Sequence, residues 1–142
     1  MSQTLYKAKA TLSELPKVAK DILNILPNNA IIFLKGDLAA GKTTLTNQIA
    51  KILNLSLVTS PTFSLQQIYE DKLFHYDFYR IDFDKILELG LIDEFEKEGL
   101  HFIEWGSFEL QELLKKAGFN IFELQIDNLG NKREYLLKAL DA

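Results

Sequence analysis

The chain has 142 residues, 47% of them hydrophobic and 25% charged, a composition typical of one globular domain rather than a disordered segment. Cysteine is absent, which excludes disulfides, a thiol nucleophile and cysteine-ligated zinc. The formal net charge of −4 argues against a protein that holds nucleic acid mainly through its own surface, although it leaves room for a local basic patch.

The N-terminal residues 1–7 lack the apolar core of a signal peptide, and no apolar run approaches the length of a membrane span. Together with the absence of cysteine, this predicts a cytoplasmic protein with no membrane contact, although a cysteine-free chain can also reside elsewhere.

The first third of the chain predicts a strand, a helix and a second strand. Residues 4–10 alternate enough for a short edge strand, and Ser13 can cap a helix that runs up to Pro27. The apolar positions with helical spacing are Leu15, Val18, Ile22 and Ile25. Residues 30–34 form an apolar run suited to a buried strand.

Residues 36–43 read G-D-L-A-A-G-K-T and fit the phosphate-binding P-loop pattern G-x-x-x-x-G-K-[ST]. A strand precedes the motif and a helix ending near Asn54 follows it, which is the context the motif needs; a tight turn with a chance Gly-Lys-Thr would explain neither flank. Backbone N–H groups and the helix N-terminus would surround the phosphates. Lys42 would reach the terminal phosphates, and the Thr43 hydroxyl would ligate Mg²⁺. The residues of this segment expected to bind nucleotide are Asp37, Leu38, Ala39, Ala40, Gly41, Lys42, Thr43 and Thr44.

The remaining segments predict antiparallel additions around a nucleotide-binding core. In chain order we expect a polar loop at 59–63, a hairpin from 64–69 and 73–79, a helix at 84–98 interrupted at Gly90, a strand at 100–103, a helix at 108–117 stopped by Gly118, and a hairpin from 121–126 and 133–138. The predicted class is α/β, a P-loop NTPase-like three-layer fold with a central, mainly parallel sheet and added antiparallel hairpin strands, in a single domain over residues 1–142.

Three oxygen-bearing side chains are candidates for the chemistry beside the P-loop. Glu104 closes a predicted strand, where the acidic residue of a nucleotidase usually sits, and Asp77 lies among aromatic neighbours, where a carboxylate is costly unless it is paired or bound to metal. Thr62 offers a hydroxyl to metal, water or γ-phosphate from a loop that follows the P-loop helix. The plain alternatives are two solvent-facing acids and a helix-capping threonine.

Other conspicuous residues have simpler interpretations. Trp105 could stack on a base, mark a partner surface or pack in the core. Arg80 could stabilise transition-state charge, but a salt bridge to Asp77 or Asp82 is the favoured interpretation. His75 and His101 are expected to be packed strand residues rather than bases or ligands.

Four motifs in a fixed order resemble one known family. They are the P-loop, Thr-Ser-Pro-Thr-Phe at 59–63, His-Tyr-Asp-Phe-Tyr-Arg at 75–80 and Ile-Glu-Trp at 103–105. Together they resemble the TsaE family, formerly YjeE, of small bacterial P-loop ATPases in tRNA threonylcarbamoyladenosine biosynthesis. The resemblance covers nearly the whole chain.

The resemblance implies binding of ATP or ADP with Mg²⁺, weak ATPase activity in isolation, and action with the TsaB–TsaD heterodimer, through which tRNA is involved indirectly. It implies roles for Lys42 as the phosphate-clamping lysine, Thr43 and Glu104 as metal-site residues, Asp77 as a second important carboxylate, Thr62 as a switch-like threonine and Trp105 as a neighbour of the nucleotide. It also implies, on looser matches, that Thr11 and Arg133 approach the base.

The chain departs from the family pattern at two places. Ala39 stands where the family commonly has an inner P-loop glycine. If that position needs a positive φ, the alanine would be strained by about 1 kcal/mol. Gly106 and Ser107 follow Trp105, where many members carry a small residue or proline and then a glutamate, so no acid is available there.

The leading hypothesis is therefore a Mg-dependent ATPase in which water attacks the γ-phosphate in line, with Asp77 or Thr62 orienting the water. One alternative is a small-molecule kinase, for which the chain looks too short. The other is a nucleotide-gated binding module in which turnover is incidental.

Overall fold

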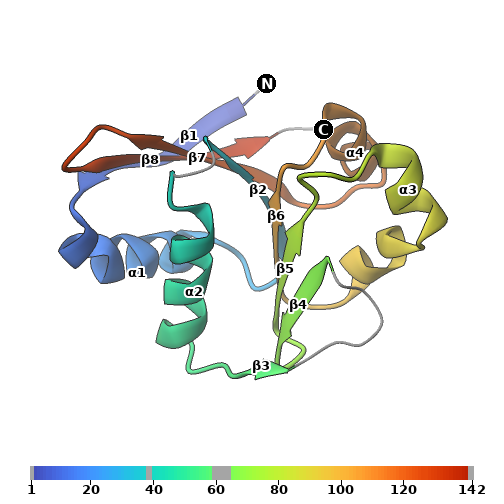
Figure 1. The fold of residues 1–142 in the computed structure, drawn as a ribbon, viewed down its shortest axis with the longest axis horizontal. Coiled ribbons are helices and arrows are strands. Elements are labelled where there is room, and N and C mark those ends of the chain that lie inside the picture. The colour runs from blue at the N-terminus through green and yellow to red at the C-terminus, as the bar shows by residue number, and fades with distance from the viewer. Residues whose placement is uncertain (1, 38–39, 59–64, 141–142) are drawn as a thin grey trace.

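The computed structural model describes residues 2–37, 40–58 and 65–140. These residues form one eight-stranded sheet in the order β1-β8-β7-β2-β6-β5-β4-β3. The strands are β1 (Ser2–Ala10), β2 (Ala30–Lys35), β3 (Leu57–Val58), β4 (Gln66–Tyr69), β5 (Leu73–Asp77), β6 (Leu100–Glu104), β7 (Ile121–Asn128) and β8 (Arg133–Leu140). Figure 1 shows the sheet crossing the molecule with helices on both sides.

Four central strands, β7, β2, β6 and β5, are parallel, and both edges of the sheet are antiparallel. The parallel register sets Leu34 and Asp77 on either side of Glu104, so three carboxyl ends meet at one edge. The predicted parallel centre and its two added hairpins are confirmed, as is the edge position of β1.

The two faces of the sheet carry separate apolar cores, and β2 contributes to both by alternation. Ile32 and Leu34 join the core under α1 (Leu15–Ile25) and α2 (Lys42–Ile52), whereas Ile31 and Phe33 join the core under α3 (Phe83–Glu88), η2 (Leu91–Glu96) and α4 (Phe108–Lys116). Figure 1 shows α1 and α2 on one side of the sheet and α3 and α4 on the other. The three-layer prediction is therefore confirmed.

Helix boundaries mostly follow the sequence signals, with one correction. Ser13 does not cap the first helix, because a 3₁₀ turn, η1 (Leu12–Glu14), precedes α1 and takes Thr11 as its N-cap. Glu14 closes a capping box, since its side chain accepts the Thr11 N–H at 2.9 Å. Gly90, with φ 74°, separates α3 from η2, as the predicted interruption requires.

The first hairpin turns through two residues in the left-handed region, Glu70 (φ 50°) and Asp71 (φ 54°), between β4 and β5. The short strand β3 was not predicted, because two residues give no periodic signal; it pairs with Ile68 and Tyr69 of β4. Among the described residues, no helix is long and apolar enough to cross a membrane.

Candidate phosphate and metal site

The two glycines of the P-loop motif, Gly36 and Gly41, occupy backbone conformations that favour glycine. Gly36 has φ 145°, and a Cβ built there would lie 2.5 Å from the Ile126 carbonyl oxygen, so only glycine fits. Gly41 has φ 103° and stands at the N-cap of α2. Leu38 and Ala39 lie outside the described residues, so the expected strain at Ala39 stays a prediction.

The N-terminus of α2 presents donors for an anion. The first helical hydrogen bond runs from Leu45 N to Gly41 O at 3.0 Å, so the N–H groups of Lys42, Thr43 and Thr44 precede the helical ladder. Ala40, by contrast, donates its N–H to Asp37 O at 3.0 Å, and its amide is therefore engaged within the loop. Among the described residues, the donors for phosphate are therefore the N–H groups at the start of α2 and not that of Ala40.

Lys42 is buried at the centre of the site. Its side chain is 3% exposed, its Nζ donates to Gly36 O at 2.8 Å, and the same nitrogen sits 3.6 Å from the Trp105 ring centroid. Burial lowers the pKa of the Lys42 ammonium, although nearby Glu104 and two further carboxylates act in the opposite direction. Among the described residues, the direct contacts of the Lys42 ammonium are a carbonyl oxygen and an aromatic ring, which it can exchange for phosphate oxygens.

Glu104 ends β6 as a buried carboxylate with two donors on one oxygen. Thr43 Oγ1 donates to its Oε2 at 2.7 Å, and His75 Nε2 hydrogen-bonds to the same oxygen. Burial alone would raise the pKa of Glu104, but the hydrogen bonds from His75 and Thr43, with the nearby charge of Lys42, hold it below its usual value of 4.5. The carboxylate is therefore held in its ionised form, which is the form that ligates a hard cation.

Asp77 stands beside Glu104 in the sheet register but in a different environment. It is exposed, and its Oδ1 accepts the Tyr79 N–H at 3.1 Å. The expected crowding by aromatic neighbours is wrong, because strand alternation sends Phe74 and Tyr76 into the core on the opposite face. Thr62 lies outside the described residues.

Arg80 does not form the favoured salt bridge. Among the described residues it makes no ion pair with Asp77 or Asp82, and its guanidinium carbon lies 5.8 Å from the Tyr79 ring centroid. The side chain of Asp82 instead caps α3 by accepting the Lys85 N–H at 2.9 Å.

Trp105 forms one wall of the site from a strained backbone. Its φ of 62° is in the left-handed region, which costs a non-glycine residue about 1–2 kcal/mol. Its ring packs against Tyr79 with centroids 5.0 Å apart and covers Lys42. The next position, Gly106, requires glycine because a Cβ there would lie 2.6 Å from the Phe33 ring. Ser107 then caps α4 by accepting the Leu110 N–H at 3.1 Å.

Arg133 and Thr11 lie on the other side of the loop. Arg133 starts β8 and faces Gly41 so closely that a Cβ on that glycine would lie 2.8 Å from Nη1. Thr11 directly follows Ala10, the register partner of Arg133. The fold thus places the end of β1 beside the start of β8, where Arg133 faces the P-loop, although the Thr11 hydroxyl is engaged with Glu14 at 2.9 Å.

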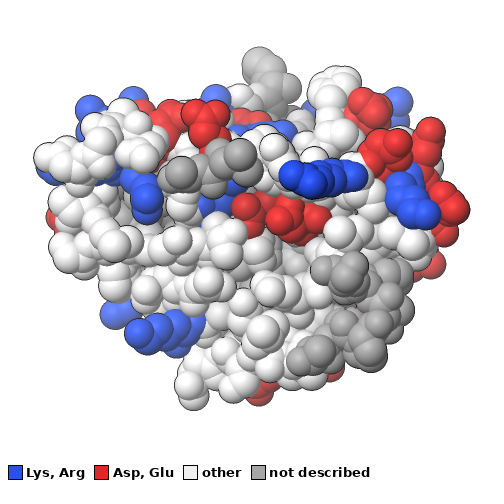
Figure 2. Space-filling model, viewed as in Figure 1, with Lys and Arg blue, Asp and Glu red and all other residues white. Residues whose placement is uncertain are grey.

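The donor set fits a hard divalent cation beside a phosphate. The Thr43 hydroxyl keeps lone pairs free after donating its proton, and Glu104 supplies an ionised carboxylate. Figure 2 shows charged side chains gathered over the carboxyl ends of the parallel strands, in the upper half of the view. Both signs are present there, as a site for a metal and an anion requires.

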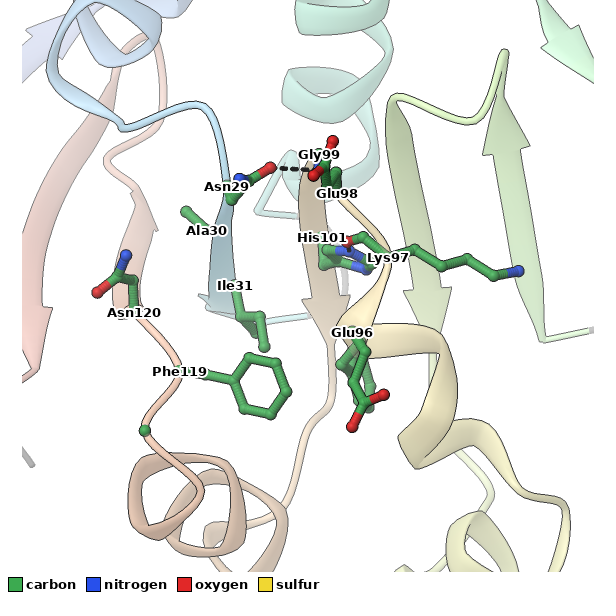
Figure 3. A pocket seen from close by; sticks show the side chains of 12 residues that line it. Asn29, Ala30, Ile31, Glu96, Lys97, Glu98, Gly99, His101, Phe119 and Asn120 are labelled. Carbon is green, nitrogen blue, oxygen red and sulfur yellow. Dashed lines mark hydrogen bonds between the residues drawn. The ribbon is translucent and has the colours of Figure 1, made fainter.

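A separate cavity lies at the opposite edge of the sheet, where the parallel strands begin. It has a volume of about 210 Å³ and is lined by the starts of β2 and β6 and by the segments before β6 and β7. Figure 3 shows His101 and Phe119 among its lining residues. Both ring nitrogens of His101 are engaged, Nδ1 with Tyr76 Oη and Nε2 with Lys97 O, each at 2.8 Å, so His101 offers the cavity no free ring nitrogen.

Comparison with known proteins assigns the chain to a family. The model of the threonylcarbamoyl adenosine biosynthesis protein TsaE matches residues 9–135. The chain belongs to the TsaE family. Two tRNA threonylcarbamoyladenosine biosynthesis proteins TsaE are similar to it: that of Bacillus subtilis is 35% identical over 78% of this chain and 77% of its own length, and that of Aquifex aeolicus is 43% identical over 63% and 67%.

The fold agrees with this TsaE assignment. The crystal structure of Bacillus subtilis YdiB superposes with a TM-score of 0.69 and 27% identity, covering 98% of this chain and 87% of that one.

Sequence reasoning did not anticipate the contact of His75 with Glu104. Expected to be a packed strand residue, His75 is indeed buried, but its ring also holds the carboxylate. The only available signal was period-two alternation, which puts His75 and Asp77 on one face of β5; the adjacency of β5 and β6 cannot be read from the sequence.

Proposed function

We propose that the protein binds and hydrolyses ATP with Mg²⁺ in the threonylcarbamoyladenosine modification of tRNA. The observation that carries the proposal is the 2.7 Å hydrogen bond from Thr43 Oγ1 to Glu104 Oε2. It joins the first turn of the P-loop helix to the end of a neighbouring parallel strand, 61 residues away in sequence. Membership of the TsaE family supports the pathway.

The P-loop would hold the triphosphate through the N–H groups at the start of α2 and through Lys42. On binding, the Lys42 ammonium would leave Gly36 O for a terminal phosphate oxygen and remain under the Trp105 ring. Because the ammonium is already partly desolvated, its attraction to phosphate is stronger than at an open surface.

Thr43 and Glu104 would hold Mg²⁺, directly or through water. When bound, the ion neutralises charge on the phosphate oxygens during transfer. Asp77, exposed at the end of β5 beside Glu104, or Thr62 would orient the attacking water. Positioning and electrostatics, rather than covalent chemistry, would then supply the rate.

We further propose that homologues of the TsaB–TsaD heterodimer are the partners, and that tRNA is involved only through them. An exposed Asp77 orients water poorly by itself, so low activity in isolation is expected until a partner closes over it. The acidic net charge is in keeping with a protein that does not itself hold tRNA.

The test is ATP turnover, measured as phosphate release by the protein alone and with a TsaB–TsaD pair. We expect slow release alone and marked stimulation by the pair. Absence of stimulation with nucleotide binding intact would contradict a partnered ATPase, and a phosphorylated acceptor in place of free phosphate would indicate a kinase. If Glu104→Ala stops turnover but modification continues, the protein acts as a nucleotide-gated binding module.

A further inference from the structure

His75 occupies a position that the proposed function leaves without a task. It is the central residue of β5, and only 6% of it is exposed. Its Nε2 contacts Glu104 Oε2, and its Nδ1 lies 3.3 Å from Gln67 Oε1 on β4. The ring therefore bridges three adjacent strands on the face that carries α2.

Both donors to Glu104 converge on the same oxygen. Thr43 and His75 reach Oε2 from α2 and β5, and Oε1 has no hydrogen-bond partner among the described residues. Two donors on one oxygen fix the rotation of the carboxylate group, so the direction of Oε1 is also fixed. Thr43 alone would fix it poorly, because a threonine that ligates metal must also satisfy that metal's geometry.

We propose that His75 is the positioning residue of the metal site: its Nε2–H holds Glu104 Oε2 so that the carboxylate meets a divalent cation in one orientation. The inference rests on the proposed function, since it names the support of the same site. His75 contacts neither nucleotide nor metal in this role. It acts as other hydrogen-bond partners of metal-ligating side chains do, whose loss typically costs about 10–100-fold in metal affinity or activity.

The contact with Gln67 connects His75 to β4, the strand next to the edge strand β3. Gln67 lies on β4, the strand that follows residues 59–64 along the chain. The series Gln67, His75, Glu104 and Thr43 thus runs from that strand to the first turn of α2 through side-chain contacts. A displacement of β4 would therefore be transmitted to Glu104 through the His75 imidazole.

The test uses Mn²⁺ as the probe ion and ADP as the nucleotide, with free Mn²⁺ read by electron paramagnetic resonance. His75→Leu removes the donor, whereas His75→Gln keeps an N–H near the position of Nε2. We expect Mn²⁺ affinity in the ADP complex to fall about tenfold or more in His75→Leu and to return to within about threefold of wild type in His75→Gln. ADP affinity without metal should stay within about twofold in both.

His101→Gln is the matched control, because His101 is the buried histidine of the neighbouring strand and touches no metal-site residue. It should leave Mn²⁺ binding unchanged even if it lowers the melting temperature. Wild-type Mn²⁺ affinity in folded His75→Leu protein would overturn the positioning role. If wild-type protein with ADP takes up no Mn²⁺, the proposed function itself fails, and this inference with it.

If His75→Leu does not fold, the wild-type imidazole can be examined directly by ¹⁵N nuclear magnetic resonance. We expect a protonated, slowly exchanging Nε2–H whose resonance moves in Glu104→Gln protein. An unprotonated Nε2, or a resonance that ignores the substitution, would overturn the inference.

Discussion

The two histidines of the chain lie on neighbouring strands and face opposite sides of the sheet. His75 meets a carboxylate and a threonine beside α2, whereas His101 stacks on Phe74 at 4.4 Å and bonds to Tyr76 inside an aromatic core. Both are buried, at 6% and 1% exposure. The two residues differ in the face of the sheet that they occupy. His75 lies on the same face as Glu104, which accepts a hydrogen bond from α2, and His101 lies on the other face.

This contrast predicts that substitutions on the two faces fail in different ways. Changes around Lys42, Glu104 and His75 should weaken nucleotide and metal chemistry at modest cost in stability. Changes around His101 and Tyr76 should lower stability and leave the chemistry intact.

The largest effect is expected for Lys42→Met. Methionine keeps apolar packing under Trp105 but removes the cation, so phosphate release should fall about 10³-fold. Lys51→Met, in the last turn of the same helix and exposed, is the control and should behave as wild type. Full activity in Lys42→Met would remove the P-loop lysine from the account.

Glu104→Gln should come next. The amide can still accept the hydrogen bonds of Thr43 and His75, so the fold should persist while the charge that attracts the metal is lost. We expect ATP turnover to fall about 10²-fold and more Mg²⁺ to be needed for half-maximal rate. Glu88→Gln, on an exposed side chain of α3, is the matched control. Equal rates in the two variants would show that Glu104 is no metal ligand.

On the other face, Tyr76→Phe should act on stability alone. The Tyr76 hydroxyl lies 2.8 Å from His101 Nδ1 and accepts from Gln66 Nε2 at 3.3 Å. Its removal leaves the buried His101 Nδ1 without a partner, whereas Gln66 Nε2 keeps its bond to Glu94 Oε1. Urea denaturation should show a loss of about 1–3 kcal/mol with the Mg²⁺ dependence of turnover unchanged. Tyr69→Phe, which removes one bond to Asn47 at 3.1 Å, should cost less.

The smallest effect is a pH dependence from the same face. Burial lowers the pKa of His101 from its ordinary 6.5, so in mild acid the unfolded chain takes up a proton that the folded chain refuses. Stability should therefore be complete above about pH 6.5 and fall as the pH drops below it. Melting temperatures of wild type and His101→Gln between about pH 7 and pH 5 should converge as the pH falls; parallel curves would contradict a neutral His101.

The sequence predicted much of the fold because its signals were local. The strand before Gly36, the helix after Lys42, the interruption at Gly90 and the stop at Gly118 each depend on residues within a few positions. The two hairpins followed from alternation and turn residues. The two-residue strand β3 carried no such signal.

The sequence indicated several residues of the candidate site but not the contacts between them. Lys42, Thr43 and Glu104 were named from motifs, and the fold brings Thr43 and Glu104 together at 2.7 Å. The exposure of Asp77 and the contact of His75 with Glu104 depend on which strands are neighbours and on which face each side chain points. Those facts arise from sheet order, which no local pattern encodes.

The most direct test of the central claim is calorimetric titration of a non-hydrolysable ATP analogue into the wild-type protein, with Mg²⁺ and with the metal chelated. We predict one nucleotide bound per chain, more tightly when Mg²⁺ is present. A well-folded protein that takes up no adenine nucleotide, or that binds it equally well without metal, would contradict a phosphate and metal site at Lys42, Thr43 and Glu104.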